Sequence, residues 1–313
     1  MVYLPADTAA NAHDFLGLVQ PDLAIFVKYE YWLNYLEEMA RRKIPVLMVS
    51  AIFRPDQVFF RWYGGRWRKV LQQISMFFVQ DDASVTLLEK AGVNNFMVSG
   101  DTRFDRVTAV RDTFVPVEPV AGFCGHSRVI VAGSTWEEDE KVWHHYANTS
   151  PGTVFIIAPH EVYEGHLRSI EKLFRKTIRY SQLLEKGTNG DAHVLIIDNI
   201  GLLSRLYHYA DVCYVGGGFG SGIHNILEAA VHGKPVIFGP EHEKFREATD
   251  LLEAGAAFTV SSAIELEKTV RNLLQDDQHR KQAGERARAY VQEKSGATKK
   301  ILAHIQENRL LTS

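Results

Sequence analysis

The sequence predicts an α/β protein built from two doubly wound parallel sheets. Short runs of β-branched and aromatic residues alternate with longer helical patterns along almost the whole chain, as in a parallel sheet with crossover helices. The alternation stops once, over residues 113–127, where prolines and glycines occur with little periodicity, and then begins again. At 313 residues the chain is long enough for two domains. We therefore expect two Rossmann-like domains joined by a linker at 113–127.

Residues 1–112 are expected to form the first domain. Its predicted strands are Leu23–Val27, Pro45–Ala51, Met76–Gln80 and Phe96–Ser99. Helices are expected near Thr8–Val19, Tyr31–Arg42, Gln57–Gln73 and Asp82–Ala91. Half of a doubly wound fold normally has about five or six strands. We therefore expect the sheet of this domain to be incomplete.

Residues 128–276 are expected to form the second domain. Its predicted strands are Val129–Ala132, Val154–Ala158, Val194–Ile197, Val212–Val215, Val236–Phe238 and Ala257–Val260. Helices are expected near Glu137–Ala147, Tyr163–Phe174, Gly201–Tyr209, Ile223–Val231, Phe245–Ala254 and Ala263–Leu274. Residues 277–313 are helical and charged, and we expect these helices to pack back across both domains.

Composition excludes several classes of protein. A net charge of −3 gives no overall basic field for nucleic acid, and Cys124 and Cys213 do not have metal-ligand spacing. The N-terminal residues lack the pattern of a signal peptide, and no window reaches the ~18 apolar residues of a membrane span. We expect a reduced, cytoplasmic protein whose contact with any membrane is peripheral.

The stretch from Asp211 to Pro240 carries the strongest functional signal. A predicted strand runs into a glycine cluster and then into a helix expected to start near Ile223; the glycines are Gly216, Gly217, Gly218, Gly220 and Gly222. Such a turn predicts unpaired backbone N–H groups at a helix N-terminus, which suit an anion such as phosphate. Glu228 is expected about one and a half turns into the helix, within reach of a ribose. The alternative is a tight turn that only packs the helix on the sheet.

Other polar residues are predicted at the same sheet edge. Ser134 and Thr135 follow a strand, although Thr135 could instead be an N-cap with Glu138 completing a capping box. His160 ends the next strand, and a lone histidine there is more often structural. His224 and Asn225 are expected in the first turn of the central helix. A zinc site at His224 is disfavoured because no His or Cys partner is suitably spaced, so we expect no metal.

Two segments of the first domain suggest a second substrate. Glu30, Trp32 and Asn34 follow a strand at the edge that faces ligands in such folds, although Glu30 could simply complement a helix dipole. Residues 59–69 combine five aromatic residues with four cations, including Arg61, Arg66 and Arg68. This mixture suits a membrane interface or an anionic, partly apolar ligand; the alternative is a core helix with a solvated basic face.

Taken together, these motifs resemble the 3-deoxy-D-manno-octulosonic acid (Kdo) transferases, inverting glycosyltransferases of the two-domain GT-B fold. The resemblance covers essentially the whole chain. Its motifs are Tyr3–Asp7, the E-x-W-x-N segment of Glu30, Trp32 and Asn34, the G-x-x-x-F-D segment of Gly100, Phe104 and Asp105, Ala132–Thr135, Gly222–Glu228 and Gly233–Pro240.

The resemblance implies CMP-Kdo as the donor and a lipid A precursor as the acceptor, at the cytoplasmic face of the inner membrane. It implies two domains facing a cleft, with the nucleotide on the second and no metal or other cofactor. The glycine turn with Ser134 and Thr135 would take the phosphate, and Glu228 would contact the ribose. The donor-side residues are then Ser134, Thr135, His160, Gly217, Gly218, Gly220, Gly222, His224, Asn225 and Glu228. The acceptor or membrane side would hold Trp32, Asn34, Arg61, Arg66 and Arg68, with Glu30 as the candidate catalytic residue.

The chain also departs from the family pattern. The family usually has an acidic residue at Lys28, proline at Leu33, arginine near Ile52, and Pro-Arg-His where this chain has Pro159-His160. Family members carry about a hundred further residues before the Tyr3–Asp7 segment, including the glutamate expected to be the general base. We therefore expect this chain alone to transfer Kdo poorly. The alternatives are a UDP-sugar-using GT-B transferase or epimerase, and a non-catalytic nucleotide-binding fragment.

Overall fold

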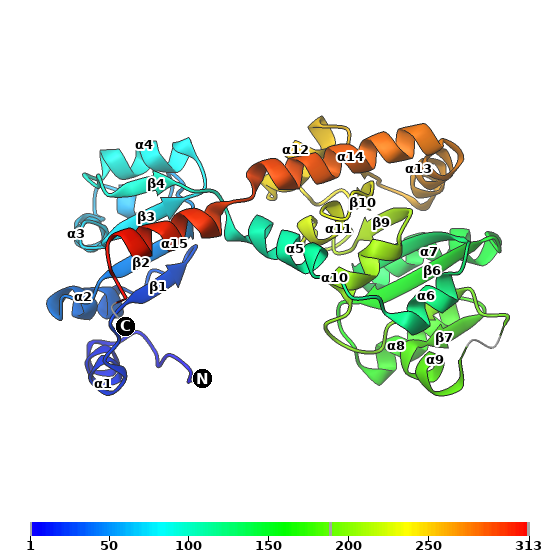
Figure 1. Cartoon of the computed structure of the whole chain (residues 1–313), viewed down its shortest axis with the longest axis horizontal. Helices are drawn as coiled ribbons and strands as arrows, with labels where there is room; N and C mark the ends of the chain where they lie inside the picture. The colour runs from blue at the N-terminus through cyan, green and yellow to red at the C-terminus, as the bar shows by residue number, and fades with distance from the viewer. Residues whose placement is uncertain (1, 188–189, 312–313) are drawn as a thin grey trace. The chain divides into compact units, whose positions relative to one another are not determined.

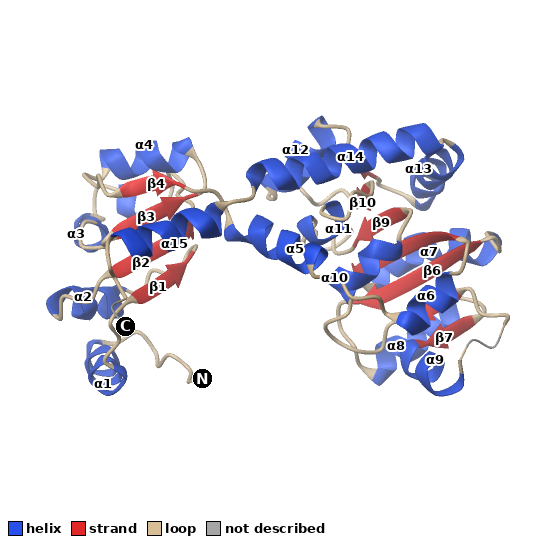
Figure 2. Ribbon diagram, in the orientation of Figure 1, coloured by secondary structure: helices blue, strands red, loops and turns tan. Residues whose placement is uncertain are grey.

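The computed structural model describes residues 2–187 and 190–311, and this part of the chain divides into two compact units (Figure 1). The first unit comprises Met1–Asp105 with Lys294–Ser313, and the second comprises Arg106–Glu293. Each unit is an α/β fold around a parallel sheet (Figure 2). The predicted fold class is therefore confirmed.

Within the described residues, the first unit has a four-stranded parallel sheet in the order β1-β2-β3-β4. The strands are β1 (Ala24–Val27), β2 (Val46–Ala51), β3 (Met76–Val79) and β4 (Phe96–Val98). The helices are α1 (Ala9–Val19), α2 (Leu33–Arg41), α3 (Gly65–Leu71), α4 (Asp82–Lys90) and, from the end of the chain, α15 (Ala297–Glu307), with a 3₁₀ turn η1 (Val58–Phe60). Each predicted strand of this unit matches one of these strands.

The two faces of the first sheet have different cores. One face packs Met48 and Phe77 against Tyr35 of α2 and against residues of α1, α3 and α4. On the other face, Leu47, Val49 and Phe78 pack against Ile301 and Ile305 of α15, the red helix of Figure 1. The alternation of side chains along β2 explains this division, because neighbouring residues of a strand point to opposite faces.

Asp105 fixes the start of α15. Its carboxylate accepts hydrogen bonds from the backbone N–H of Gly296 at 2.5 Å and of Thr298 at 2.8 Å, and from the Thr298 hydroxyl at 3.0 Å. These N–H groups belong to the first turn of the helix, which has no intrahelical partners of its own. Asp105 of the G-x-x-x-F-D motif therefore has a structural role in holding the C-terminal helix on the first unit.

In the described part of the second unit, the parallel sheet has seven strands in the order β11-β10-β9-β5-β6-β8-β7. They are β5 (Arg128–Thr135), β6 (Thr153–Pro159), β7 (Thr177–Arg179), β8 (Val194–Ile196), β9 (Val212–Val215), β10 (Val236–Phe238) and β11 (Ala257–Thr259). The helices are α5 (Thr102–Asp112, begun in the first unit), α6 (Glu118–Cys124), α7 (Glu137–Thr149), α8 (Glu164–Leu173), α9 (Tyr180–Lys186), α10 (Leu203–Leu206), α11 (Leu227–Ala230), α12 (Arg246–Glu253), α13 (Ala263–Gln275) and α14 (Asp277–Lys294), with a 3₁₀ turn η2 (Tyr207–Tyr209). The short strand β7 was not predicted.

The predicted linker at 113–127 is wrong, because this segment contains α6 and belongs to the second unit. Pro119 lies in the first turn of α6, where a proline costs no hydrogen bond, and Val120, Phe123 and Cys124 are buried. The division between the units falls at Asp105–Arg106, within α5. The C-terminal helices are shared: α14 is in the second unit except for its last residue, and α15 is in the first.

The single helix predicted over Gln57–Gln73 is also wrong. The segment forms η1 and α3, separated by a turn that ends at Gly64. A Cβ atom on Gly64 would lie 1.9 Å from the carbonyl oxygen of Val58, so only glycine fits at this turn. None of the described helices is long and apolar enough to span a bilayer.

Candidate nucleotide site of the second unit

The polar residues singled out in the second domain gather at the carboxyl edge of its sheet. Because β5, β6, β9 and β10 are parallel neighbours, the segments that follow them leave the sheet at the same edge. Ser134 lies at the end of β5, His160 follows β6, and the glycine turn follows β9. In open α/β sheets this edge is where ligands bind.

The first three glycines of the turn have no room for a side chain, because other backbone atoms lie close to them. A Cβ atom on Gly216 would lie 2.3 Å from the carbonyl oxygen of Ser134, and one on Gly218 would lie 2.6 Å from the backbone N of Gly239. Gly217 has φ +93° and its Cβ position is 2.4 Å from the carbonyl oxygen of Gly222. The tight-turn alternative therefore accounts for Gly216, Gly217 and Gly218, whereas Gly220 is exposed with no atom closer than 3.7 Å to its Cβ position.

The amides of the glycine turn are mostly bonded inside the protein, which corrects the prediction that they are unpaired. Gly217 N–H donates to Asp139, those of Gly220 and Gly222 donate to the carbonyl of Gly217, and that of His224 donates to Gly216. Within the described residues, the amides of Gly218, Phe219 and Ser221 and those of residues 225–228 have no such partner. The longest run of amides without a partner in the described chain is therefore at Asn225 to Glu228, just after the glycine turn.

The helix after the turn begins later than predicted. Residues 222–225 are irregular and α11 starts at Leu227, so His224 and Asn225 precede the helix and Glu228 lies in its first turn. The prediction that His224 and Asn225 lie in the first turn of the central helix is therefore wrong. Instead, Asn225 Nδ2 donates to Glu228 Oε1 at 3.0 Å, while Asn225 Oδ1 is buried without a partner.

Asp139, which sequence reasoning missed, joins the turn after β5 to the turn after β9. Its fully buried carboxylate accepts hydrogen bonds from Trp136 N–H at 2.9 Å, from Gly217 N–H at 2.9 Å and from the Tyr214 hydroxyl at 2.6 Å. Burial raises the pKa of the Asp139 carboxyl, against the opposite effect of these three donors. Trp136 is thus the N-cap residue of α7, with Asp139 at the third helical position, and the predicted capping box of Thr135 and Glu138 is wrong.

The Thr135 hydroxyl is turned into the protein and cannot meet a phosphate in this structure. It donates to Glu140 Oε1 at 2.9 Å, and the other carboxylate oxygen of Glu140 lies 3.1 Å from His166 Nε2. All three side chains are buried. Burial raises the pKa of Glu140, although the neighbouring His166 opposes this. Ser134 has φ +52° and stays partly exposed at the strand end.

Three aromatic rings lie together beside the glycine turn. The Trp136 indole N–H donates to His224 Nε2 at 2.9 Å, and the two rings are nearly parallel at 18°. The exposed His160 ring lies over both, with its centroid 4.2 Å from that of His224 and 4.7 Å from that of Trp136. Burial and the neighbouring His160 lower the pKa of His224. A lowered pKa favours the neutral ring, whose Nε2 accepts the hydrogen bond from Trp136. The pair His160 and His224 was predicted at this edge, whereas the contribution of Trp136 was not.

The candidate residues of the first unit have mixed roles. Asn34 is engaged within the protein: its side-chain amide donates to the Asp7 carbonyl at 2.9 Å, and its backbone N–H donates to the Asp7 carboxylate at 3.0 Å. The two motifs of the chain that contain Asp7 and Asn34 thus hold each other at the start of α2. Glu30 is exposed and accepts a hydrogen bond from the Trp32 indole N–H. Glu30 therefore stays exposed, whereas Trp32 is partly buried against the core of the unit.

The aromatic and basic segment divides into buried and exposed parts. Phe59, Phe60 and Trp67 pack in the core, while Trp62 and Tyr63 are 91% and 62% exposed. Arg66 makes a two-pronged ion pair with Glu37, and Arg68 donates to the carbonyls of Phe59 and Arg61. The core-helix alternative thus holds for the aromatic residues that face inward. The tip at residues 61–63 remains exposed.

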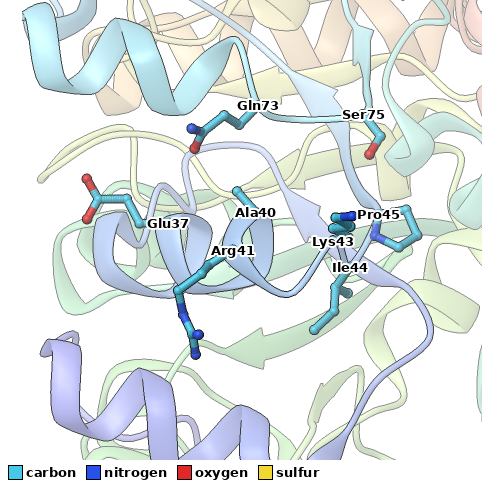
Figure 3. Close-up of a pocket in the computed structure, with 8 residues that line it drawn as sticks. All are labelled: Glu37, Ala40, Arg41, Lys43, Ile44, Pro45, Gln73 and Ser75. Carbon is cyan, nitrogen blue, oxygen red and sulfur yellow. The ribbon is translucent and has the colours of Figure 1, made fainter.

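A pocket of about 620 Å³ lies at the opposite edge of the first sheet (Figure 3). It is lined by Glu37, Ala40 and Arg41 of α2, by Lys43, Ile44 and Pro45 before β2, and by Gln73 and Ser75 before β3. None of the predicted site residues lines it. Within the described chain, no group of three or more His, Cys, Asp or Glu side chains is arranged to hold a metal ion.

Comparison with known proteins agrees with these features. A family described as 3-deoxy-D-manno-octulosonic-acid transferase matches residues 1–106, and the family of group 1 glycosyl transferases matches residues 179–290. The 3-deoxy-D-manno-octulosonic acid transferase of Bordetella pertussis is 28% identical over 97% of this chain and 73% of its own length. That of Rickettsia typhi is 26% identical over 87% of this chain and 60% of its own length.

Solved structures support the fold. The UDP-GlcNAc 2-epimerase from Neisseria meningitidis, solved bound to UDP-GlcNAc, superposes with a TM-score of 0.62 over 91% of this chain and 79% of its own. The identity of 16% restricts this likeness to the fold. The predicted GT-B-like architecture is therefore confirmed.

Proposed function

Because this chain belongs to the family of 3-deoxy-D-manno-octulosonic acid transferases, we propose that it takes Kdo from CMP-Kdo and transfers it to a lipid A precursor in lipopolysaccharide biosynthesis. Membership of the family makes it a glycosyltransferase. We assign the donor to the carboxyl edge of the second sheet and the acceptor to the first unit. We propose no metal and no other cofactor.

The observation that carries the donor assignment is the unsatisfied set of polar groups from Asn225 to Glu228. Four consecutive amides without partners in the described chain suit the phosphate of CMP, since an anion can satisfy several of them at once. Glu228 keeps one carboxylate oxygen clear of Asn225 for a ribose hydroxyl, and the buried Asn225 Oδ1 awaits a donor. The stacked rings of His160, His224 and Trp136 offer a flat surface beside these groups.

The transfer needs a base on the acceptor side. In an inverting reaction the acceptor hydroxyl loses its proton as its oxygen bonds the anomeric carbon, while the CMP phosphate leaves with the electrons of the broken bond. We propose that the Glu30 carboxylate of the first unit acts as this base. It is exposed after β1, and the hydrogen bond from the Trp32 indole N–H orients it. The expectation that the chain alone turns over slowly stays a prediction, and an assay with CMP-Kdo and a lipid A precursor tests it.

Nucleotide preference gives the first test. A ligand present at 100 times its dissociation constant stabilises the folded state by about 2.7 kcal/mol, so CMP should raise the melting temperature clearly while UDP at the same concentration should not. In Glu228→Gln the CMP effect should fall because the ribose loses its charged acceptor. The matched control is Glu243→Gln, an exposed residue in the loop after β10 that makes no described hydrogen bond. A larger shift with UDP would favour a UDP-sugar enzyme, and no shift with either nucleotide would contradict the donor assignment.

We also propose that the tip at residues 61–63 touches the cytoplasmic face of the inner membrane. An exposed tryptophan and tyrosine beside an arginine suit the headgroup region of an anionic bilayer. The double change Arg61→Glu with Trp62→Ser should therefore reduce cosedimentation with vesicles that contain phosphatidylglycerol. Leu18→Ser, at an exposed apolar residue of α1, is the control and should bind as the unchanged protein does. Equal binding by all three proteins would remove the tip from the membrane contact.

A further inference from the structure

A closed circuit of hydrogen bonds in the second unit includes the backbone of the exposed His160. Thr135 takes part in it twice: its hydroxyl donates to Glu140 Oε1 at 2.9 Å, and its carbonyl accepts from His160 N–H at 2.9 Å. His166 Nε2 lies 3.1 Å from each oxygen of the Glu140 carboxylate, and His166 Nδ1 lies 3.0 Å from the carbonyl oxygen of Glu161. Because Glu161 follows His160 in the chain, the path of bonds returns to its start. The circuit thus joins the end of β5, the helices α7 and α8 and the turn after β6.

The side chains of this circuit are closed off from solvent. Thr135, Glu140 and His166 are 1%, 2% and 3% exposed. Other buried side chains line a small cavity beside Thr135 and Glu140; they are Ala132, Trp143, Phe155, Ile157 and Phe174. A carboxylate and an imidazole are costly to desolvate, and well-packed apolar residues of similar volume would stabilise such a core at least as well. Core stability therefore gives little reason for the pair of Glu140 and His166.

Both recorded hydrogen-bond partners of the His166 imidazole are acceptors. They are the Glu140 carboxylate at Nε2 and the Glu161 carbonyl at Nδ1. Each ring nitrogen must therefore bring a proton to its contact, and the proton at Nε2 is shared with the carboxylate of Glu140. The carboxylate in this way keeps the Nδ1–H group of His166 directed at Glu161.

The circuit supplies the backbone bonds of the turn after β6. Within the described chain, the His160 N–H and the Glu161 carbonyl are the backbone groups of residues 160–162 that have a recorded partner. The His160 side chain makes no hydrogen bond among the described residues, and its contacts are the stacked rings of His224 and Trp136. The direction in which His160 leaves the sheet thus depends on two backbone bonds, and both lead to Glu140.

We propose that His166 is a positioning residue of the candidate nucleotide site. Together with Glu140 it holds the turn after β6, so that the His160 ring stays stacked and is presented to the donor nucleotide. That the ligand is a nucleotide rests on the proposed function. The placement of His160 by the circuit depends on contacts of the second unit alone.

The first measurement needs no ligand. In protein that contains isotope-labelled histidine, stacking on Trp136 should move the NMR signals of the His160 ring protons away from those of an exposed histidine. The double change Glu140→Leu with His166→Phe opens the circuit and puts apolar residues in place of the buried pair, so the His160 signals should move to the exposed values. Thermal melts report whether each variant folds. Should the double variant unfold, Thr135→Val removes one bond of the circuit and carries the same comparison.

Two further variants separate the circuit from a general loss of contacts. Glu140→Gln keeps the circuit closed, because its amide oxygen can accept from Thr135 and its NH₂ group can donate to Nε2 of His166; the signals should stay as in the unchanged protein. The matched control is His145→Phe with Glu267→Leu, which removes a histidine–glutamate contact of 2.6 Å whose histidine is exposed. This control should also leave the signals unchanged.

Calorimetric titration with CMP then tests the link to the nucleotide. We expect the opened circuit to weaken CMP binding by about tenfold. In a protein that also carries His160→Ala, the same two changes should weaken it by less than about twofold, because the residue through which they act is gone. Equal losses with and without His160, or unmoved His160 signals in a folded open variant, would overturn the inference. If CMP does not bind the unchanged protein, the proposed donor fails, and the NMR comparison still decides whether the circuit positions His160.

Discussion

Replacing Asp139 with alanine is expected to lower the free energy of unfolding by about 3 kcal/mol and to abolish the stabilisation by CMP. The carboxylate satisfies the Tyr214 hydroxyl and the amides of Gly217 and Trp136, and the alanine would leave all three donors without their acceptor. Part of the cost is offset because the ionised carboxylate is itself expensive to bury, as its raised pKa shows. The loss of CMP binding follows because the two turns of the nucleotide site share this one acceptor.

Chemical denaturation with the slope and midpoint both recorded would measure the change. Glu138→Ala is the control, because Glu138 is the exposed neighbour and should change stability by less than about 0.5 kcal/mol. Tyr214→Phe removes one donor and keeps the carboxylate, so it should cost about 1 kcal/mol and preserve CMP binding. An Asp139→Ala protein that is as stable as Glu138→Ala would show that the shared carboxylate does not hold the site together.

Gly216→Ala is expected to lower the free energy of unfolding by about 3 kcal/mol, whereas Gly220→Ala should change it by less than about 1 kcal/mol. The new methyl group at position 216 would lie 2.3 Å from the Ser134 carbonyl oxygen and 2.7 Å from Thr135 Cα, and both are backbone atoms that cannot move alone. The clash would push the end of β9 away from the end of β5. At Gly220 the nearest atom is 3.7 Å away, and its φ is not in the left-handed region.

The same pair separates the two interpretations of the glycine turn. CMP should still stabilise Gly220→Ala, because the anion is assigned to the amides of residues 225–228, and it should not stabilise Gly216→Ala, in which the turn is displaced. Thermal melts with and without CMP give both results. If Gly220→Ala folds normally but no longer responds to CMP, the phosphate contacts the glycine turn directly, and the assignment to the later amides is wrong.

Local pattern was sufficient for most of the fold because strand and helix periodicity is a property of neighbouring residues. Every predicted strand has a counterpart in the structure, and β7 was missed because Thr177–Arg179 contains a single apolar residue, Ile178, and so shows no strand pattern. The helix expected over Gln57–Gln73 failed at Gly64, where a contact with Val58 decides the backbone. The segment 113–127 was taken for a linker because its prolines and glycines hide a helix whose apolar residues are buried.

The candidate site, like the fold, was predicted from the sequence only where local pattern decides it. The sequence placed Ser134, His160 and the glycine turn at one sheet edge, since the carboxyl ends of parallel strands must meet there. It could not identify Asp139, because an acidic residue in the first turn of a helix ordinarily faces solvent and complements the dipole. Only the packing of α7 against β9 brings that carboxylate within hydrogen-bond distance of Gly217 and Tyr214. Tertiary packing likewise turns the Thr135 hydroxyl away from the carboxyl edge of the sheet and towards Glu140.

The sequence by itself determined the two α/β domains, the resemblance to the Kdo transferases and the sheet edge at which the nucleotide is expected, because each of these depends on patterns of adjacent residues. The tertiary structure alone decided which groups are left for a ligand. Hydrogen bonds within the fold engage the amides of Gly216, Gly217, Gly220 and Gly222, the Asn34 side chain and Arg66. In the described chain they leave the amides of residues 225–228 without a partner. A polar group is open to a ligand only when no other part of the chain satisfies it, and contacts across the fold determine that.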